Sequence, residues 1–316
     1  MGGNVFAGKT TSIKREYINP TLTEYFQELK RLFPKKADIF NTNHFIPLGS
    51  VGKKAVSGDI DLGIDIKHVM NFDDIPGTLL SWEIHDSDFE KEFETLKKRA
   101  RTATDDQLRS KVLLKLISMH ANDFTNSITF EESKVGPGTM FSLFPQYSDQ
   151  NIELSEGVQI DWMVGDIDWL KFSYYSSAYP EDSNVKGLHR TQLMLSAFQV
   201  ANLSFGHADG VKDKETREVI ATTPAEALAV LSERLGFTVT QEDAENYYTL
   251  YTLLAENMDP DQKNRLLCTY FKILDSTRVD IPDNLTYHWL NYKDTLGLTG
   301  KFLPENSKLK EHLING

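Results

Sequence analysis

Alternating apolar and polar positions predict the central strands of this chain. From Gly58 to Ile66 the sequence reads GDIDLGIDI, with isoleucine or leucine at every second position and aspartate or glycine between them. This period of two sends the apolar and acidic side chains to opposite faces of a sheet. Further strands are predicted in SITFEES, TMFSLFPQY and VQIDWMVG, and HFIPLG predicts a short one.

Helical spacing accounts for most of the remaining chain. Residues 1–20 are expected to form a polar N-terminal arm that ends at Pro20, and TLTEYFQELKRLF predicts a helix after a threonine cap. A charged segment at about 86–121 is also predicted to be helical. Four amphipathic stretches follow residue 185, and the last three begin with threonine or aspartate caps. We therefore expect an α+β fold: a mixed sheet with flanking helices at 21–180, then an all-helical domain at 186–316.

Composition indicates a soluble globular protein. The 316 residues are 40% hydrophobic and 11% aromatic, which argues against disorder. No apolar run approaches the ~18 residues of a membrane span, and no secretory signal is evident, so no membrane partner is expected. Cys268 is the sole cysteine and lies on an apolar helical face, where an inert thiol is expected. An intrachain disulfide is excluded, no disulfide-linked partner is expected, and the expected location is the cytoplasm of a bacterial or phage-infected cell.

The net charge of −12 disfavours a protein that coats duplex DNA nonspecifically, because such binding depends on a surplus of lysine and arginine. It leaves room for one basic groove on an acidic body. The basic run between Lys97 and Lys115 has two interpretations, a track for a nucleic-acid backbone or a solvated helix face.

The stretch LGSVGKKAVSGDIDLGIDI, residues 48–66, carries the candidate chemistry. Aspartate is depleted in strands, so a cause beyond local propensity must favour it here. A phosphate-binding P-loop is excluded, because Pro47 and Lys54 stand where glycine and serine or threonine are required. A calcium-binding EF-hand loop from Asp59 fails at Ile64 and Met70. Paired cysteine or histidine spacings for zinc are absent from the sequence.

Two carboxylates in this strand have the spacing of a metal site. Asp59 and Asp61 project from one strand face about 7 Å apart along the strand. At that spacing both can reach a common pair of magnesium ions, which bind a few carboxylates together with substrate phosphates. Gly49 allows the backbone to approach a ligand closely, and the Ser50 hydroxyl can donate to the same phosphate.

These residues resemble the signature of the DNA polymerase β-like nucleotidyltransferase superfamily: a Gly-Ser pair, about ten residues, an Asp-hydrophobic-Asp strand and a third carboxylate on a later strand. The resemblance covers residues 48–66 and 158–164, and the chain also resembles nucleotidyltransferase-like proteins of tailed phages. It implies that Gly49 and Ser50 hold a triphosphate. It further implies that Asp59, Asp61 and Asp161 bind two Mg²⁺ ions, for which Mn²⁺ can substitute, and that Asp161 is the base.

The implied reaction moves a nucleoside monophosphate from an NTP such as ATP to an acceptor hydroxyl, with release of pyrophosphate. An RNA or tRNA 3′ end is one implied acceptor, and a protein or small molecule is the alternative. A non-catalytic nucleotide-binding scaffold is a third interpretation. Two features depart from the family pattern: Lys53 and Lys54 replace an arginine or Gly-Thr pair, and the long gap before Asp161 implies the helical insertion at 86–121.

Several further residues have both a functional and a structural interpretation. Lys53 and Lys54 either contact phosphate or lie on the surface of the loop. Lys186 and Arg190 either hold the β- and γ-phosphates or are solvent-exposed residues at the start of a helix. Tyrosines near residue 175 stack a nucleobase or pack in a core. Two more carboxylates, Asp65 and Glu153, are weaker candidate metal ligands. The tyrosines are Tyr174, Tyr175 and Tyr179.

Overall fold

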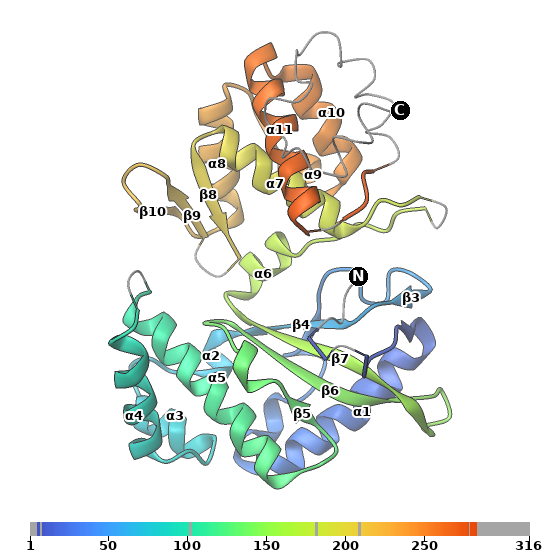
Figure 1. Cartoon of the computed structure of the whole chain (residues 1–316), viewed down its shortest axis with the longest axis vertical. Helices are drawn as coiled ribbons and strands as arrows, with labels where there is room; N and C mark the ends of the chain where they lie inside the picture. The colour runs from blue at the N-terminus through green and yellow to red at the C-terminus, as the bar shows by residue number, and fades with distance from the viewer. Residues whose placement is uncertain are drawn as a thin grey trace. The chain divides into compact units, whose positions relative to one another are not determined.

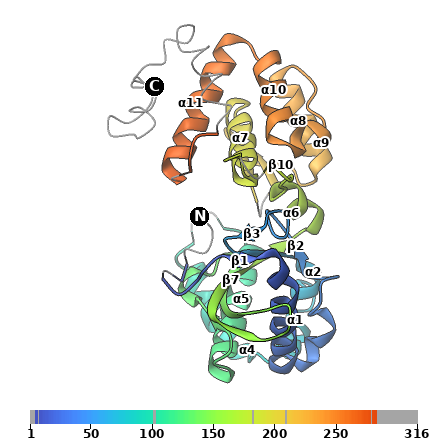
Figure 2. The same cartoon turned by 90° about the vertical axis from the view of Figure 1, so that its right-hand side faces the viewer.

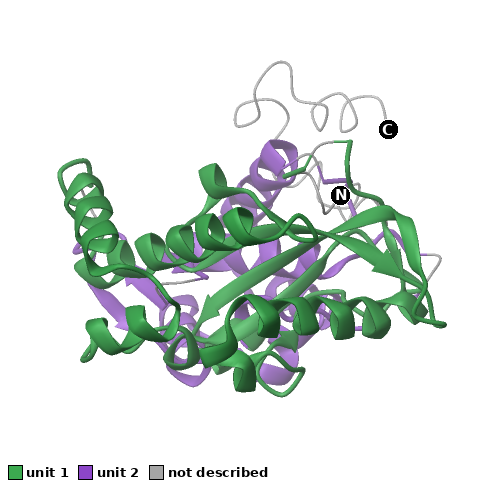
Figure 3. Ribbon diagram, turned by 90° about the horizontal axis from the view of Figure 1, so that it is seen from below, with its two compact units in different colours: residues 1–171 green, residues 172–316 purple. Residues whose placement is uncertain are grey.

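A computed structural model describes residues 5–6, 8–100, 103–180, 183–207, 210–277 and 279–282. The chain divides into two compact units, residues 1–171 and 172–316 (Figure 3). Unit 1 contains the predicted sheet with its flanking helices. Unit 2 is mainly helical. The α+β class predicted from the sequence is therefore confirmed.

The sheet of unit 1 has five strands in the order β2-β4-β7-β6-β5 (Figure 1). β4 and β7 are parallel, whereas the other neighbours are antiparallel, so the sheet is mixed as predicted. β6 occupies the TMFSLFPQY segment at the predicted bounds. The strand bounds are β2 Ile46–Pro47, β4 Ile60–Asp65, β5 Thr129–Phe130, β6 Thr139–Tyr147 and β7 Glu153–Gly165.

Two long helices, α1 and α5, pack against β6 (Figures 1 and 2). They cover the sheet face that carries Ile160 and Trp162, both fully buried. Asp161 lies between these two residues in β7 and so projects from the other face. The helices of unit 1 are α1 Arg15–Leu32, α2 Ile66–Val69, α3 Ile75–Ser81, α4 Asp86–Lys97, α5 Asp105–Phe124 and α6 Ile167–Ser173, which ends two residues into unit 2; the 3₁₀ helices are η1 Pro34–Ile39 and η2 Glu132–Lys134.

Helix α1 begins at Arg15, six residues before the predicted start, and contains Pro20. Proline lacks the N–H that would bond to the Glu16 carbonyl, so the sequence predicted a helix that begins only after Pro20. Tertiary packing outweighs this loss, because Ile18 and Thr21 are buried on either side. Thr21 does not cap a helix; its hydroxyl accepts the Tyr147 N–H at 2.9 Å.

The segment before α1 is built into the fold rather than forming a polar arm. Strand β1 (Ile13–Lys14) pairs antiparallel with β3 (Val56–Ser57). Ile13 is fully buried. This pairing ties the start of the chain to the loop that follows Gly49 and Ser50.

Unit 2 contains a small sheet, so the expectation of an all-helical domain was wrong in this detail. Its antiparallel strands have the order β10-β9-β8. In β8 the buried residues Leu203 and Phe205 alternate with more exposed neighbours, which is the period of two of a strand. The strand follows a turn at Asn202, whose φ is +60°. The strands are β8 Leu203–Gly206, β9 Gly210–Asp213 and β10 Val219–Ala221.

The helices of unit 2 follow the predicted amphipathic segments. Thr223 and Thr240 accept backbone N–H groups as N-caps of α8 and α9, as predicted. The third segment is split at Asn246, which has an extended backbone and caps α10. The bounds are α7 Gly187–Val200, α8 Pro224–Leu235, α9 Gln241–Glu245, α10 Tyr247–Asn257 and α11 Pro260–Thr277.

A buried hydrogen-bond network joins α1 to the sheet. The Trp162 indole N–H donates to the Tyr25 hydroxyl at 2.8 Å. The Tyr25 hydroxyl also lies 2.8 Å from the Ser142 hydroxyl, which donates to the Ile160 carbonyl at 3.0 Å. Tyr25 and Trp162 are both fully buried.

We expect Tyr25→Phe to reduce the free energy of unfolding by about 1–3 kcal/mol, because it leaves the Trp162 N–H buried without its acceptor. The same hydroxyl deletion at half-buried Tyr17 on α1 is the matched control and should change it by less than about 0.5 kcal/mol. Urea unfolding of both variants measures the difference. Equal losses would show that the network does not stabilise the fold.

Candidate metal centre

Three carboxylates meet at the start of the parallel strand pair. Asp59, Asp61 and Asp161 each offer one oxygen, and these oxygens lie within 4.8 Å of one another. The register of β4 and β7 sets Asp61 directly opposite Asp161. Neighbouring strands are about 4.8 Å apart, so side chains on the same face at one register position must be close. Asp59 immediately precedes β4 and adds the third group.

The cluster concentrates negative charge in a poorly solvated position. Asp161 is only 5% exposed. Burial, together with the charges of Asp61 and Asp59, raises the pKa of Asp161 to about 8. Burial and the charge of Asp59 raise the pKa of Asp61 to about 7. A divalent cation would relieve this repulsion, and a set of hard carboxylate oxygens is the donor chemistry that Mg²⁺ and Mn²⁺ prefer.

The Gly49 turn lies directly against Asp61. Gly49 has a φ of +58°, and a Cβ at this position would lie 2.9 Å from the Asp61 Oδ2 atom. The Leu48 N–H donates to the Asp61 carbonyl at 2.9 Å, which continues the β2–β4 pairing into the turn. Glycine is therefore required here for its conformation and for its small size. Ser50 is half-buried in the same turn.

Arg15 anchors the lysine loop that follows the turn. Its Nε and Nη2 groups donate to the carbonyls of Lys54 and Lys53, both at 3.1 Å. Its backbone N–H donates to the Ala55 carbonyl at 2.9 Å. Lys53 is exposed and Lys54 is half-buried. Sequence reasoning missed Arg15, since nothing in the pattern links residue 15 to residues 53–55.

Gln159 is a second residue that sequence reasoning missed. Its Nε2 atom donates to both carboxylate oxygens of Asp161, at 2.8 and 3.0 Å. Gln159 is 2% exposed. A signal was available, because the period of two places Gln159 on the same face as Asp161.

The two weaker carboxylate candidates lie outside the cluster. Asp65 caps α2 by accepting the Lys67 N–H, and it forms an ion pair with the Lys67 ammonium at 2.8 Å. Glu153 lies at the start of β7 and accepts the Tyr147 hydroxyl at 3.1 Å. Both carboxylates therefore have local structural partners.

Lys186 and Arg190 lie in unit 2, at the start of α7. Lys186 is exposed at the N-cap, where its backbone N–H donates to His189 Nδ1 at 2.9 Å. Arg190 is fully buried. It donates to the carbonyls of Ala244 and Phe172 at 2.6 and 2.8 Å. Burial lowers its pKa to about 10. These contacts favour a structural role for Arg190, and phosphate binding by either residue stays a prediction.

The tyrosines and the basic run also have internal partners. Tyr174 stacks on His207 at 4.4 Å, and the Tyr179 hydroxyl accepts the Tyr247 N–H at 3.2 Å. Along the basic run, three side chains form ion pairs with carboxylates, and Arg101 lies outside the described residues. The pairs are Lys97–Asp105 at 2.7 Å, Lys115–Glu92 at 2.7 Å and Arg109–Asp106 at 3.5 Å.

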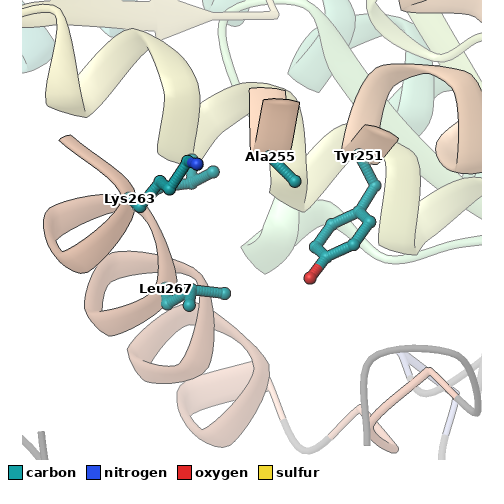
Figure 4. Close-up of a pocket in the computed structure, with 5 residues that line it drawn as sticks. Tyr251, Ala255, Lys263 and Leu267 are labelled. Atoms are coloured by element: carbon teal, nitrogen blue, oxygen red, sulfur yellow. The ribbon is translucent and has the colours of Figure 1, made fainter. Parts of the chain in front are cut away.

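A small, open apolar hollow lies between α10 and α11 in unit 2 (Figure 4). Its lining is Tyr251, Ala255, Lys263, Leu266 and Leu267. The Tyr251 ring and the Leu267 side chain project into it (Figure 4). Cys268, the next residue of α11, is half-buried, and burial raises the pKa of its thiol, as expected for an unreactive cysteine.

Across the part of the chain that the structure describes, no helix is both long and apolar enough to cross a lipid bilayer.

Comparisons with known proteins give matches only among solved structures. A scan of family models finds no match, and a search of curated proteins finds no relative. Among solved structures, 64 chains match. One is polymerase beta of Leishmania infantum in a ternary P/T complex, with 11% identity over 72% of this chain and 79% of that chain, and a TM-score of 0.32. Its ternary gap complex has 12% identity over 77% and 70%, and a TM-score of 0.29. With TM-scores this low, these matches carry no argument about the chain.

Gly49→Ala tests whether the turn shapes the carboxylate cluster. Gly52→Ala is the matched control, because Gly52 also has a positive φ, +70°, but a Cβ there meets nothing within 4 Å. Both variants should lose about 1–2 kcal/mol of stability from backbone strain. We expect only Gly49→Ala to displace Asp61 and weaken Mn²⁺ binding, by about tenfold or more, in calorimetric titrations. Equal Mn²⁺ affinities would contradict the contact.

The raised pKa values predict an unusual pH dependence of stability. An unfolded Asp61 or Asp161 ionises near pH 3.8, whereas the folded groups ionise near pH 7 and 8. Between these values the folded state binds more protons, so the free energy of unfolding of the metal-free protein falls as pH rises. Asp161→Asn should flatten this decline between pH 4 and 8, and Mg²⁺ should oppose it at pH 8. Identical pH profiles for the wild type and Asp161→Asn would contradict the charge cluster.

Proposed function

We propose that this protein is a divalent-metal-dependent nucleotidyltransferase. It transfers a nucleoside monophosphate from an NTP to an acceptor hydroxyl and releases pyrophosphate. The observation that supports this proposal is the convergence of Asp59, Asp61 and Asp161 within 4.8 Å, beside the Gly49 turn. Three hard anionic ligands at the edge of a sheet, next to a close-approach glycine, match what a metal-bound triphosphate requires.

The three carboxylates would have two roles, metal binding and proton transfer. Asp59, Asp61 and Asp161 would hold two Mg²⁺ ions, which neutralise charge on the phosphates and on the attacking and leaving oxygens. Asp161 is the group that accepts the proton of the acceptor hydroxyl.

The turn and the lysine loop would hold the triphosphate. Gly49 permits close approach of the backbone, and the Ser50 hydroxyl donates to a phosphate oxygen. Lys53 and Lys54 add positive charge on the adjoining loop, which Arg15 and the β1–β3 pair hold in place. Holding reactants in line and neutralising charge account for most of the catalysis of phosphoryl transfer.

The acceptor supplies the hydroxyl nucleophile. An RNA 3′ end and a protein or small-molecule hydroxyl both offer one. The ion pairs of Lys97, Arg109 and Lys115 reduce the positive charge available for an RNA backbone along α4 and α5. Together with the net charge of −12, this favours a protein or small-molecule acceptor. We propose the reducing cytoplasm, which supplies NTPs and Mg²⁺, as its compartment.

Pyrophosphate release tests the proposal directly. Each of the four NTPs is incubated with Mg²⁺ and candidate acceptors: an RNA oligonucleotide, a protein lysate and a metabolite extract. We expect the wild type to release pyrophosphate, and Asp59→Asn, Asp61→Asn and Asp161→Asn to be slower by about 10³-fold or more, since each removes a charge that stabilises the transition state. Asp65→Asn, on the same strand but outside the cluster, is the matched control and should retain activity.

Two results would contradict the proposal. The first is equal rates in the wild type and the Asp61→Asn variant, which would separate any activity from the carboxylates. The second is stabilisation by NTP and Mg²⁺ in thermal unfolding without pyrophosphate release from any NTP, which would indicate a nucleotide-binding scaffold.

A further inference from the structure

The N-terminal segment, of which residues 5–6 and 8–11 are described, contacts β7 near the carboxylate cluster. Thr10 forms a parallel bridge with Gly157, and the Thr11 N–H donates to the Gly157 carbonyl at 2.9 Å. β6 occupies the other edge of β7 at this point. The segment therefore lies on the edge that β4 takes from Ile160 onward. It pairs with β7 on the same edge as β4, but nearer to the start of β7.

This segment fits tightly against the sheet. A Cβ at Gly157 would lie 2.7 Å from the Leu143 Cδ1 atom of β6 and 3.1 Å from the Lys9 carbonyl oxygen, so glycine allows both neighbours to approach. The Gln146 Nε2 atom donates to the Thr11 hydroxyl at 2.9 Å. Phe6 is buried, with 7% exposure. The segment is thus a packed part of unit 1.

A chain of hydrogen bonds leads from this segment to the Asp161 carboxylate. The Val5 N–H donates to the Gln159 Oε1 atom at 3.0 Å. The Gln159 Nε2 atom donates to both oxygens of Asp161. A backbone N–H can only donate and a carboxylate can only accept, so a single orientation of the Gln159 amide satisfies both partners. The flipped amide would set its oxygen against the carboxylate.

We propose that Val5 helps to position the metal centre: its N–H locks the Gln159 amide, and the locked amide holds the Asp161 carboxylate in its ligating orientation. The inference rests on the proposed function only in that Asp161 binds the metal. Gln159 is a positioning residue, because it acts through Asp161. Partners of this kind fix the geometry of metal-binding carboxylates, and their loss typically reduces metal affinity or activity by about 10–100-fold.

Substitutions at Val5 isolate the single hydrogen bond. Val5→Pro removes the N–H donor, whereas Val5→Ala keeps it and changes only the side chain. We expect Val5→Pro to weaken Mn²⁺ binding by about fivefold, the value of one hydrogen bond, with Val5→Ala near the wild type. Gln159→Leu should weaken it by about 10–100-fold. Mn²⁺ affinity is measured by electron paramagnetic resonance of the free ion, and circular dichroism checks that each variant is folded.

Equal Mn²⁺ affinities in folded Val5→Pro and Val5→Ala would overturn the inference, because a merely structural segment leaves affinity unchanged once the fold is intact. The comparison of the two Val5 variants decides this even where Gln159→Leu fails to fold. Failure of the proposed function gives a different pattern. A Val5→Pro defect in Mn²⁺ binding, without pyrophosphate release from any NTP, would support the positioning role and contradict nucleotidyl transfer.

Discussion

The parallel pairing of β4 with β7 is the constraint on which the site depends. It sets Asp61 opposite Asp161 at a spacing that two like charges would not adopt in solution. The sheet, buried on its other face by α1 and α5, supplies the packing that holds them there. The electrostatic strain is visible in the raised pKa values of both carboxyl groups. A divalent cation is the natural counterpart of such an arrangement, because it turns repulsion into shared ligation.

The surroundings of the cluster keep this geometry rigid. On one side the Gly49 turn lies so close to Asp61 that a Cβ there would be 2.9 Å from the Asp61 Oδ2 atom. On the other side the Gln159 amide binds both oxygens of Asp161. Beneath the sheet the Tyr25–Trp162 hydrogen bond ties β7 to α1. These contacts hold the three carboxylates close together without a cation, which is the preorganisation that the proposed catalysis would require.

Local periodicity made the strands of the sheet and their two faces predictable from the sequence, in GDIDLGIDI and VQIDWMVG. The spacing of Asp59 and Asp61 suggested a metal site, whereas Asp161 was singled out by the resemblance to the nucleotidyltransferase signature. Features that depend on tertiary packing were not accessible. Because of Pro20, the sequence predicted the start of α1 six residues too late. The position of Arg190 at the start of a helix did not reveal that its side chain is buried. The short strands after Asn202 lie between segments with helical periodicity. The contacts of Arg15 and Val5 join residues distant in sequence, so no local pattern contains them.

The central claim is that Asp59, Asp61 and Asp161 share divalent cations. The most direct measurement is anomalous scattering from crystals of the protein grown with Mn²⁺ and a non-hydrolysable NTP analogue. We expect Mn²⁺ peaks about 2.0–2.3 Å from oxygens of all three carboxylates, with the triphosphate against the Gly49 turn. Mn²⁺ bound elsewhere, or nucleotide bound with no cation between Asp61 and Asp161, would contradict it.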